Sequence, residues 1–400
     1  MHNKKNKLFL RIMCTVLGVF ALTLIGLFSV YMLWEKAPDV DSKIPTATPA
    51  ASAGATAEAD NGLPFDTERA DGVYTILLVG NDQGNGNTDT IMVGKIDTVQ
   101  HKMDFVSIPR DTLINVNWDV RKINSVYWGS KNSGGNGIDA LRNHIKRLTG
   151  FDVDCYAVID LKVFMDTVDA LGGVYFDVPQ AMDYEDADQN LFIHLSPGYQ
   201  LLDGNQAMGV VRFRSGYANG DLGRIEMQHN FLKACADQFI TLGNIPNISK
   251  VVNILAGGLD TNLSSANIAF FLRQAIQCKS EDINFYTAPN TATMVSGYSY
   301  AVLDINEWLQ MVNDYINPYG TQVGYGNVDI VYISGNSFAA TTTLQGDWYY
   351  YQTPQPTVSP ETVITAPPET PTPTGPAIIV VPTETPTQPP APSDGTIVLG

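Results

Sequence analysis

The chain has 400 residues, of which 44% are hydrophobic, so it can form one large domain or two ordinary ones with well-filled cores. Its formal net charge of −17 makes it a poor general binder of nucleic acid or of anionic membrane surfaces. An anionic ligand would therefore need a local cluster of cations. No lysine or arginine follows Lys279, and the cations beyond the N-terminal segment fall largely between Lys95 and Arg273. We expect such a cluster there.

The N-terminal segment predicts a membrane anchor. Residues 12–34 form an uncharged apolar run that, at about 1.5 Å per residue, can span a bilayer core of about 30 Å. Basic residues precede the run and acidic residues follow it, which places residues 1–11 in the cytoplasm and the rest outside the cell membrane. A cleaved signal peptide is the alternative, but the run is longer than such peptides need and no small-x-small site ends it. We therefore expect a retained, single-pass transmembrane helix.

Composition divides the remainder into four parts. Residues 35–68 are rich in proline, alanine, threonine and serine and predict a flexible linker. Residues 69–320 have the composition of a folded domain, and residues 321–352 predict a small C-terminal extension of uncertain structure. Residues 353–400 are dominated by proline and threonine and predict a disordered tail.

Within 69–320, apolar strand patterns alternate with helical ones. The helix around residues 138–148 has its stop signal at Gly150, and Asp160 is placed to cap a helix that ends at Gly172 and Gly173. A long helical pattern begins at Arg224. This mixture predicts helices layered on a central sheet, an α/β fold. The expected strands are 74–79, 91–96, 103–108, 174–178 and 210–214.

The loop after the first strand carries two carboxylates, Asp82 and Asp89, in a stretch rich in glycine and asparagine. Hard cations such as Mg²⁺ take carboxylate oxygens together with water and phosphate oxygens, so this loop is a candidate metal site. No Lys-Ser/Thr pair follows, so it is not a Walker A loop. An ordinary Asn/Asp/Gly turn has the same composition.

The third strand is ended by a proline and followed by Arg110 and Asp111. An arginine held by a neighbouring aspartate can present its planar fork to a phosphate, although a surface ion pair would look the same in sequence. Shortly downstream, Lys122 stands before Ile123 and Asn124. It is a further candidate phosphate ligand, or simply part of a solvated surface.

The strongest signal is a group of three arginines. Arg212 and Arg214 have strand spacing, which would point both to one face, where two cations need an anion between them. If a helix starts near Asp221, Arg224 and Gln228 share one of its faces near its N-terminus, where anions are favoured. This arrangement predicts a pyrophosphate cradle; the alternative is a salt-bridge network with Asp221 and a nearby glutamate.

Other kinds of chemistry have little support. Cys155, Cys235 and Cys278 are isolated, without CxxC spacing, and at most one disulfide can form among them; buried free thiols are the alternative. There is no GxSxG, HExxH or Cys-His pattern. His194 lies in an alternating, strand-like stretch, which favours a structural role over a catalytic one.

Seven segments of this chain, taken in order, resemble the LytR-CpsA-Psr family. A short basic start followed by one membrane span is also similar to that family. Each segment is weak alone, but the ordered set over about 70–240 is specific. One departure is that Gln83 and Gly84 stand where the family often has an arginine. The matching segments are ILLVGND (76–82), TDTIMV (88–93), SIPRDT (107–112), KIN (122–124), DALGGVYFDVP (169–179), IHLSPGYQLLDGNQAMGVVRFR (193–214) and DLGRIEMQ (221–228).

The resemblance implies an α/β/α domain with a central mixed sheet and an apolar pocket for a polyprenyl chain. It implies transfer of a polyprenyl-pyrophosphate-linked glycopolymer, of the teichoic acid or capsular polysaccharide type, to peptidoglycan. By the same resemblance, Mg²⁺, with Mn²⁺ as an alternative, falls on Asp82 and Asp89. The phosphate-binding positions fall on Arg110, Lys122, Arg212, Arg214, Arg224 and Gln228.

In this interpretation a peptidoglycan hydroxyl attacks the phosphorus nearest the glycopolymer, and polyprenyl phosphate leaves. Asp89, or failing that Asp221, is the candidate for accepting the hydroxyl proton. Metal and arginines would stabilise the leaving group. Two alternatives remain open: a polyprenyl-pyrophosphate hydrolase, and a non-catalytic wall-associated scaffold or regulator.

Overall fold

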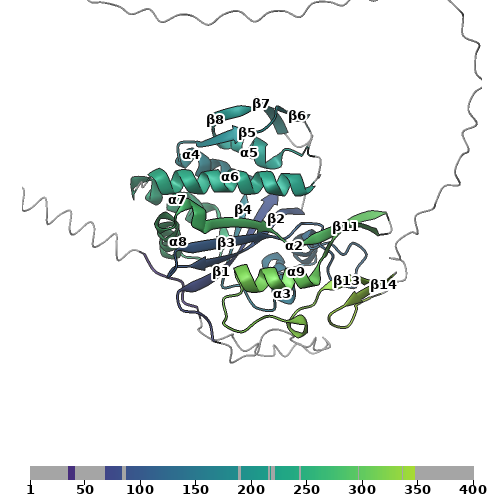
Figure 1. The fold of residues 1–400 in the computed structure, drawn as a ribbon. Helices are drawn as coiled ribbons and strands as arrows, with labels where there is room; N and C mark the ends of the chain where they lie inside the picture. The colour runs from purple at the N-terminus through teal and green to yellow at the C-terminus, as the bar shows by residue number, and fades with distance from the viewer. Residues whose placement is uncertain are drawn as a thin grey trace, which may run out of the picture. The chain divides into compact units, whose positions relative to one another are not determined.

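A computed structural model shows the fold (Figure 1). No helix in the described part of the chain is long and apolar enough to cross a membrane, and the predicted span 12–34 lies outside that part, as do residues 41–67 and the tail from 347 onward. The described residues fall within one compact unit, Met1–Pro354. The structure describes residues 35–40, 68–82, 87–187, 191–214, 217, 221–242, 245–295, 297–335 and 337–346.

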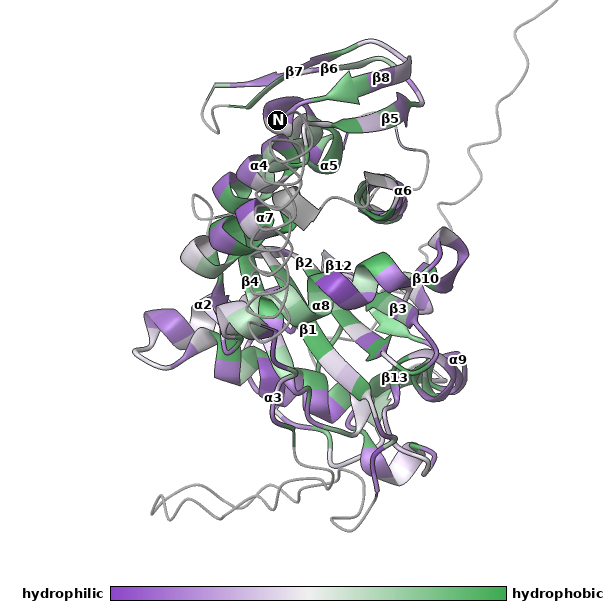
Figure 2. Ribbon diagram, turned by 90° about the vertical axis from the view of Figure 1, so that its left-hand side faces the viewer, coloured by the Kyte–Doolittle hydropathy of each residue, from purple (hydrophilic) through white to green (hydrophobic). Residues whose placement is uncertain are grey.

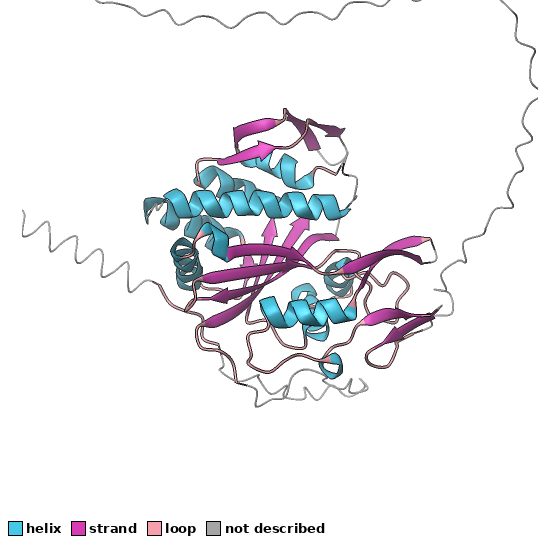
Figure 3. Ribbon diagram, viewed as in Figure 1, coloured by secondary structure: helices cyan, strands magenta, loops and turns pink. Residues whose placement is uncertain are grey.

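A six-stranded mixed sheet forms the centre, in the order β10-β3-β2-β1-β4-β9 (Figure 3). β1 runs antiparallel to β2 and parallel to β4, and β3 is antiparallel to β2 and parallel to β10. The carboxyl ends of β1, β3, β4 and β10 therefore share one edge. The strands are β1 Val73–Asp82, β2 Asn87–Asp97, β3 Lys102–Ser107, β4 Cys155–Asp160, β9 Asp260–Thr261 and β10 Ile283–Thr287.

One face of the sheet is covered by α2 (Asn124–Asn132), α3 (Gly137–Thr149) and α9 (Ile305–Met311), which continues into the π-turn Val312–Ile316. Their shared core with β1 and β2 includes Leu77 and Trp308, both fully buried. α3 confirms the predicted helix: Asn136 accepts hydrogen bonds from two backbone N–H groups at its start, and Gly150 adopts φ 82° just after its end.

On the opposite side of the sheet lie the helices α4 to α8 and two small two-stranded sheets, β5–β8 and β6–β7 (Figures 1 and 2). β5 pairs with β8 and β6 pairs with β7, and the buried sides of β5, β7 and β8 join a core formed with α4, α5 and α6. As predicted, the Asp160 carboxylate accepts from the Val163 N–H and caps α4. These elements are α4 Leu161–Ala170, α5 Gly204–Arg212, α6 Asp221–Leu242, α7 Ile245–Gly258, α8 Ser265–Gln277, β5 Val174–Val178, β6 Met182–Asp186, β7 Leu191–Leu195 and β8 Gly198–Leu202.

The predicted linker begins with residues that are packed rather than extended in solvent. The Lys36 N–H donates to the Ala266 carbonyl, and the Asn267 side chain donates to the Lys36 carbonyl. Arg273 on α8 forms an ion pair of 2.6 Å with Glu35. The first residues after the predicted span therefore lie against α8.

The described residues after 320, which end at 346, are built into the domain. The hairpins β11–β12 and β13–β14 share a small core around the buried Tyr300 and Val331. Asp329 is 6% exposed and accepts hydrogen bonds from Nδ2 of Asn115 (2.8 Å), from the Thr342 hydroxyl and from Nε of Arg147 (2.9 Å). The remaining elements are β11 Asn290–Val295, β12 Tyr298–Leu303, β13 Val331–Ser334, β14 Ser337–Ala340 and the 3₁₀ turns Ser280–Asp282 and Tyr325–Asn327.

Because Asp329 joins these hydrogen bonds, replacing it tests how much the C-terminal segment contributes to the stability of the domain. Replacing Asp329 by alanine removes the carboxylate that pairs with Arg147 and accepts from the Asn115 amide, so the free energy of unfolding should fall by about 1.5–3 kcal/mol, measured by urea denaturation. Glu281→Ala is the control, because the Lys279–Glu281 pair is exposed on both sides (77% and 76%) and should matter little. Equal stability of Asp329→Ala and the parent would show that the segment adds nothing to the domain.

Candidate functional site

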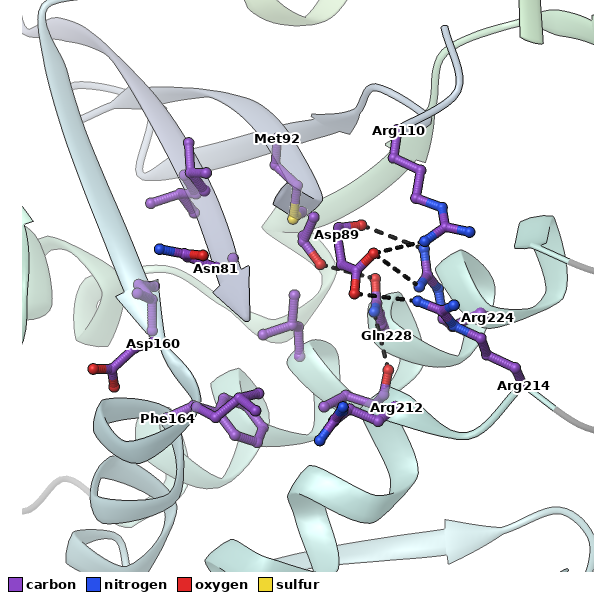
Figure 4. Close-up of a pocket in the computed structure, with 18 of the residues that line it drawn as sticks. Asn81, Asp89, Met92, Arg110, Asp160, Phe164, Arg212, Arg214, Arg224 and Gln228 are labelled. Atoms are coloured by element: carbon purple, nitrogen blue, oxygen red, sulfur yellow. Dashed lines mark hydrogen bonds and ion pairs between the residues drawn. The ribbon is translucent and has the colours of Figure 1, made fainter. Parts of the chain in front are cut away.

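A pocket of about 710 Å³ opens at the edge of the sheet where β1, β3 and β4 end (Figure 4). In open α/β sheets, ligands bind in the crevice outside the carboxyl ends of the strands. Four arginines and two aspartates line this pocket, so it is cationic within an acidic protein. Its charged lining residues are Asp89, Arg110, Asp160, Arg212, Arg214 and Arg224.

Asp89, near the start of β2, stands at the centre of the arginines. Oδ1 accepts from Nη1 of Arg110 at 2.7 Å, and Oδ2 accepts from Nη2 of Arg214 at 3.1 Å. Nη1 of Arg224 lies 3.8 Å from Oδ1, and Nη2 donates to the Asp89 carbonyl at 3.3 Å. Figure 4 shows the three guanidinium groups converging on this one carboxylate. The sequence did not predict that Asp89 itself is the anion between them.

The electrostatics of Asp89 follow from this contact. Burial alone would raise its pKa, but the hydrogen bond from Arg110 and the charges of Arg214 and Arg224 outweigh burial and lower the pKa below the ordinary 3.8. Asp89 is therefore ionised at neutral pH and is a weak base. The ionised carboxylate of Asp89 is therefore better suited to bind cations than to accept a proton.

Arg212 and Arg214 do not form a strand, and this prediction was wrong. Residues up to Arg212 belong to α5, which begins with a capping box in which Asp203 accepts from the Gln206 N–H and Gln206 accepts from the Asp203 N–H. The chain then turns at Phe213, which is 4% exposed and anchors the corner. Both arginines still line the pocket, but they reach it from the end of a helix and from the turn that follows.

Helix α6 starts at Asp221, as predicted, and places Arg224 and Gln228 one turn apart. Arg224 is 1% exposed, and a charge buried to this extent requires a partner, which Asp89 supplies. Gln228 Nε2 donates to the Val211 carbonyl at 3.0 Å, and Oε1 accepts from the Thr90 hydroxyl at 3.4 Å. Gln228 lines the pocket and also fixes α6 against α5 and β2.

The loop after β3 is paired differently from the prediction. Arg110 is held by Asp89, whereas the neighbouring Asp111 forms an ion pair of 3.0 Å with Lys122. Nζ of Lys122 also lies 5.5 Å from the centre of the Tyr300 ring. The Asp111 carbonyl accepts from the Ala301 N–H of β12 at 2.9 Å. Lys122 is thus part of the contact between this loop and the C-terminal hairpins, and its role as a phosphate ligand stays a prediction.

Two predicted residues, Asp82 and Asp221, have side chains outside the described part of the structure. Among the described residues no group of three or more metal-binding side chains forms. Asp89 nevertheless fits Mg²⁺, which proteins usually hold with one or two carboxylates together with water and phosphate oxygens. Its carboxylate faces the pocket and is 29% exposed, so it could supply the protein part of such a site.

An apolar part of the pocket continues from the cationic one. It is lined by side chains of β1, β2, β4, α4 and α6, and a hydrocarbon chain would lose its contact with water there. Sequence analysis named none of these residues, because strand and helix residues that line a pocket have the same pattern as core residues. They include Leu78, Met92, Ile159, Leu161, Phe164 and Leu232.

The three cysteines in the described residues are free, so the open question of a disulfide is answered by free thiols. Burial raises the pKa of Cys155 and of Cys235 to about 12, which makes both thiols unreactive. His194 is in β7, as expected, and its Nδ1 lies 2.6 Å from Asp183 on the outer face of the β6–β7 hairpin. It does not line the pocket.

Comparison with known proteins identifies the family. The LytR_cpsA_psr family model matches residues 43–317, which is more than half of the chain. The chain belongs to the LytR-CpsA-Psr family. The structures of Bacillus subtilis TagV (TM-score 0.52, 23% identity, 62% of this chain and 100% of that one) and of TagT bound to LI-WTA (TM-score 0.51, 20% identity, 63% and 92%) share the fold.

Curated LytR-CpsA-Psr relatives differ in their descriptions. The Staphylococcus aureus (strain COL) regulatory protein MsrR is 29% identical over 237 residues, covering 56% of this chain and 69% of MsrR. The B. subtilis polyisoprenyl-teichoic acid–peptidoglycan teichoic acid transferase TagV is 28% identical over 200 residues, 48% of this chain and 50% of TagV. The Corynebacterium glutamicum cell wall biosynthesis protein LcpA is 29% identical over 291 residues, 60% and 55%.

The lowered pKa of Asp89 gives a pH test within this LytR-CpsA-Psr site. A carboxyl group with a lower pKa in the folded than in the unfolded protein stabilises the fold above the unfolded value, and this contribution disappears as the pH falls through the folded value. At pH 7, Asp89→Asn should therefore lower the free energy of unfolding by about 1–2 kcal/mol. In urea denaturation the gap between parent and variant should close below pH 3.8. A gap independent of pH would contradict the charge assignment.

Proposed function

We propose that the protein is a membrane-anchored phosphotransferase that moves a glycopolymer from a polyprenyl-pyrophosphate carrier to a hydroxyl group of peptidoglycan. The observation that carries this proposal is the arginine cluster on Asp89, which adjoins an apolar cavity in one pocket. A substrate with an anionic group joined to a long hydrocarbon suits both parts. TagV, a relative of this chain, is a teichoic acid–peptidoglycan transferase, which supports the same activity here.

In the proposed complex the pyrophosphate takes the position toward which the arginines already point. Arg110 and Arg214, which are 24% and 49% exposed, can turn from Asp89 to the phosphate oxygens, while the buried Arg224 keeps its hold on the Asp89 backbone. Guanidinium groups bind phosphate with two parallel hydrogen bonds, so the exchange replaces one charged partner by another. Arg212, at the end of α5, is the fourth cation of the lining.

The reaction itself is a displacement at phosphorus. The acceptor hydroxyl oxygen forms a bond to the phosphorus that carries the glycopolymer, the bond from that phosphorus to the bridging oxygen breaks, and polyprenyl phosphate leaves with the electron pair. The arginines stabilise the charge that develops on the leaving group, in an environment partly shielded from water. The hydroxyl proton goes to a base, for which Asp89 and, failing that, Asp221 are the candidates.

A divalent cation, Mg²⁺ by preference, would be held by Asp89 together with Asp82 and would supply electrophilic stabilisation of the phosphate oxygens. The three guanidinium groups around Asp89 repel a metal ion, unless an anion binds together with it. We therefore expect the metal and the pyrophosphate to bind together.

The membrane anchor belongs to the same proposal. Residues 12–34 would hold the domain outside the cell membrane, where a polyprenyl carrier can enter the pocket from the bilayer. The contact of Glu35 and Lys36 with α8 supports a short, defined connection between that span and the domain.

The decisive assay incubates the full-length protein in detergent with a polyprenyl-pyrophosphate oligosaccharide, Mg²⁺ and a peptidoglycan fragment, and follows both polyprenyl phosphate and the joined sugar. Release with joining is the expected result. Release without joining would point to a hydrolase, and binding without release to a non-catalytic wall protein.

The arginine assignment is tested with Arg214→Ala in the same assay. Loss of one donor to the developing negative charge should cost about 2–4 kcal/mol of transition-state stabilisation, so turnover should fall by about 30- to 900-fold. Arg142→Ala is the matched control, because Arg142 donates to the Val153 carbonyl outside the pocket and its loss should leave turnover unchanged. Unchanged turnover in Arg214→Ala would remove it from the reaction.

A further inference from the structure

The pocket wall contains a buried polar atom that pairs with none of the described residues. Asn81, at the end of β1, is 8% exposed and lines the pocket. Its Oδ1 is buried and, among the described residues, accepts no hydrogen bond. A buried amide oxygen left in this state costs about 1–3 kcal/mol, so the fold gains nothing from it. Such an atom in the wall of a binding pocket points to a ligand that completes it.

The local backbone explains how Asn81 comes to lie there. The pairing of β1 with β2 is regular up to Gly80, and a bulge shifts the register between Gly80 and Asn81. Bulges of this kind redirect side chains and are common next to binding sites. On its other side Asn81 is opposite Asp160 in the parallel ladder with β4. Asn81 and Asp160 are thus neighbours at the carboxyl ends of two adjacent strands.

The pocket therefore has two polar ends. Figure 4 shows Arg110, Arg214 and Arg224 grouped on one side of Asp89, and Asn81 and Asp160 on the other. Asp160 accepts from the Val163 N–H at 2.7 Å and caps α4, so its carboxylate is held in place. The carboxylate of Asp160 disfavours a phosphate group at this end, and Oδ1 of Asn81 requires a hydrogen-bond donor.

If the protein has the function proposed above, the part of the substrate that binds beside Asn81 and Asp160 must carry hydrogen-bond donors. A polyprenyl chain has no hydrogen-bond donor, and an ionised pyrophosphate has only acceptors. The hydroxyl and amide N–H groups of the attached sugar are its only donors. We propose that Asn81 and Asp160 form a subsite for the first sugar of the lipid-linked glycopolymer, with Oδ1 of Asn81 accepting a hydrogen bond from that sugar.

The subsite is tested by a pair of variants that differ in one group. Asn81→Thr retains an oxygen that can accept a hydrogen bond, and Asn81→Val has the same shape without it; both residues suit a strand. The full-length proteins, in detergent with Mg²⁺, are titrated with two probes, polyprenyl pyrophosphate carrying one N-acetylglucosamine and the same polyprenyl pyrophosphate without sugar. The quantity compared is the ratio of the two dissociation constants.

The parent protein should prefer the sugar-bearing probe. Asn81→Val should reduce that preference by about fivefold, the effect of one neutral hydrogen bond, while Asn81→Thr keeps most of it. Removal of the unsatisfied amide should also raise the melting temperature of ligand-free Asn81→Val, by about 3 °C. A fall in the melting temperature would instead show that the amide serves the fold and would overturn the proposal.

Other outcomes are equally decisive. If both variants keep the preference of the parent, Asn81 does not contact the sugar. If Asn81→Val weakens both probes alike, and the loss disappears when the titration is repeated in EDTA, then Oδ1 serves a metal ion and the sugar subsite is wrong. If the parent binds neither probe, the proposed function fails and this inference with it, a result that is distinct from a parent that binds both equally.

Discussion

One carboxylate holds the site together. The guanidinium groups of Arg110, Arg214 and Arg224 come from three separate parts of the chain, the loop after β3, the turn after α5 and the first turns of α6, and they would repel one another without an anion. Asp89, near the start of β2, supplies that anion. The same contact that holds these elements together keeps the cations gathered at the pocket, where the proposed pyrophosphate would meet them.

The elements that carry the arginines are themselves fixed by neutral contacts. Gln228 joins α6 to β2 and α5, and His229, on the next position of α6, lies 2.7 Å from the Ser107 hydroxyl at the end of β3. Burial lowers the pKa of His229 to about 4, so it contributes a neutral hydrogen bond at physiological pH. In the proposed complex, where Arg110 and Arg214 would exchange Asp89 for a substrate, these contacts would hold α6 in place and keep the site preorganised.

Most of the predicted segments could be read from the sequence, including the five-residue strand β5, whereas the stretch 210–214 could not. The apolar pattern and the caps of α3 and α4 indicated a helix without ambiguity, and the apolar runs of β1 to β3 indicated strands. Residues 210–214 fit a strand over a few positions, and only the capping box several residues upstream identifies a helix. Charge pairing was missed for another reason: Asp111 adjoins Arg110 in sequence, yet the fold gives Arg110 to Asp89. Asn81 has no sequence signal at all, because its place in the pocket wall depends on a bulge in β1 and on the register with β4, which only the fold shows.

The division of charge explains how an acidic protein can bind an anion. At physiological ionic strength, fields from exposed charges are screened beyond about 8 Å, so the net charge of −17 acts weakly inside the pocket. There the contact partners decide, and Arg224, which is 1% exposed, is screened least. The acidic exterior disfavours free polyanions at the surface, whereas an anion attached to a hydrocarbon gains burial in the apolar cavity as well. Under the proposed function, the pairing of these two parts of the pocket would select a lipid-linked anion over a soluble one.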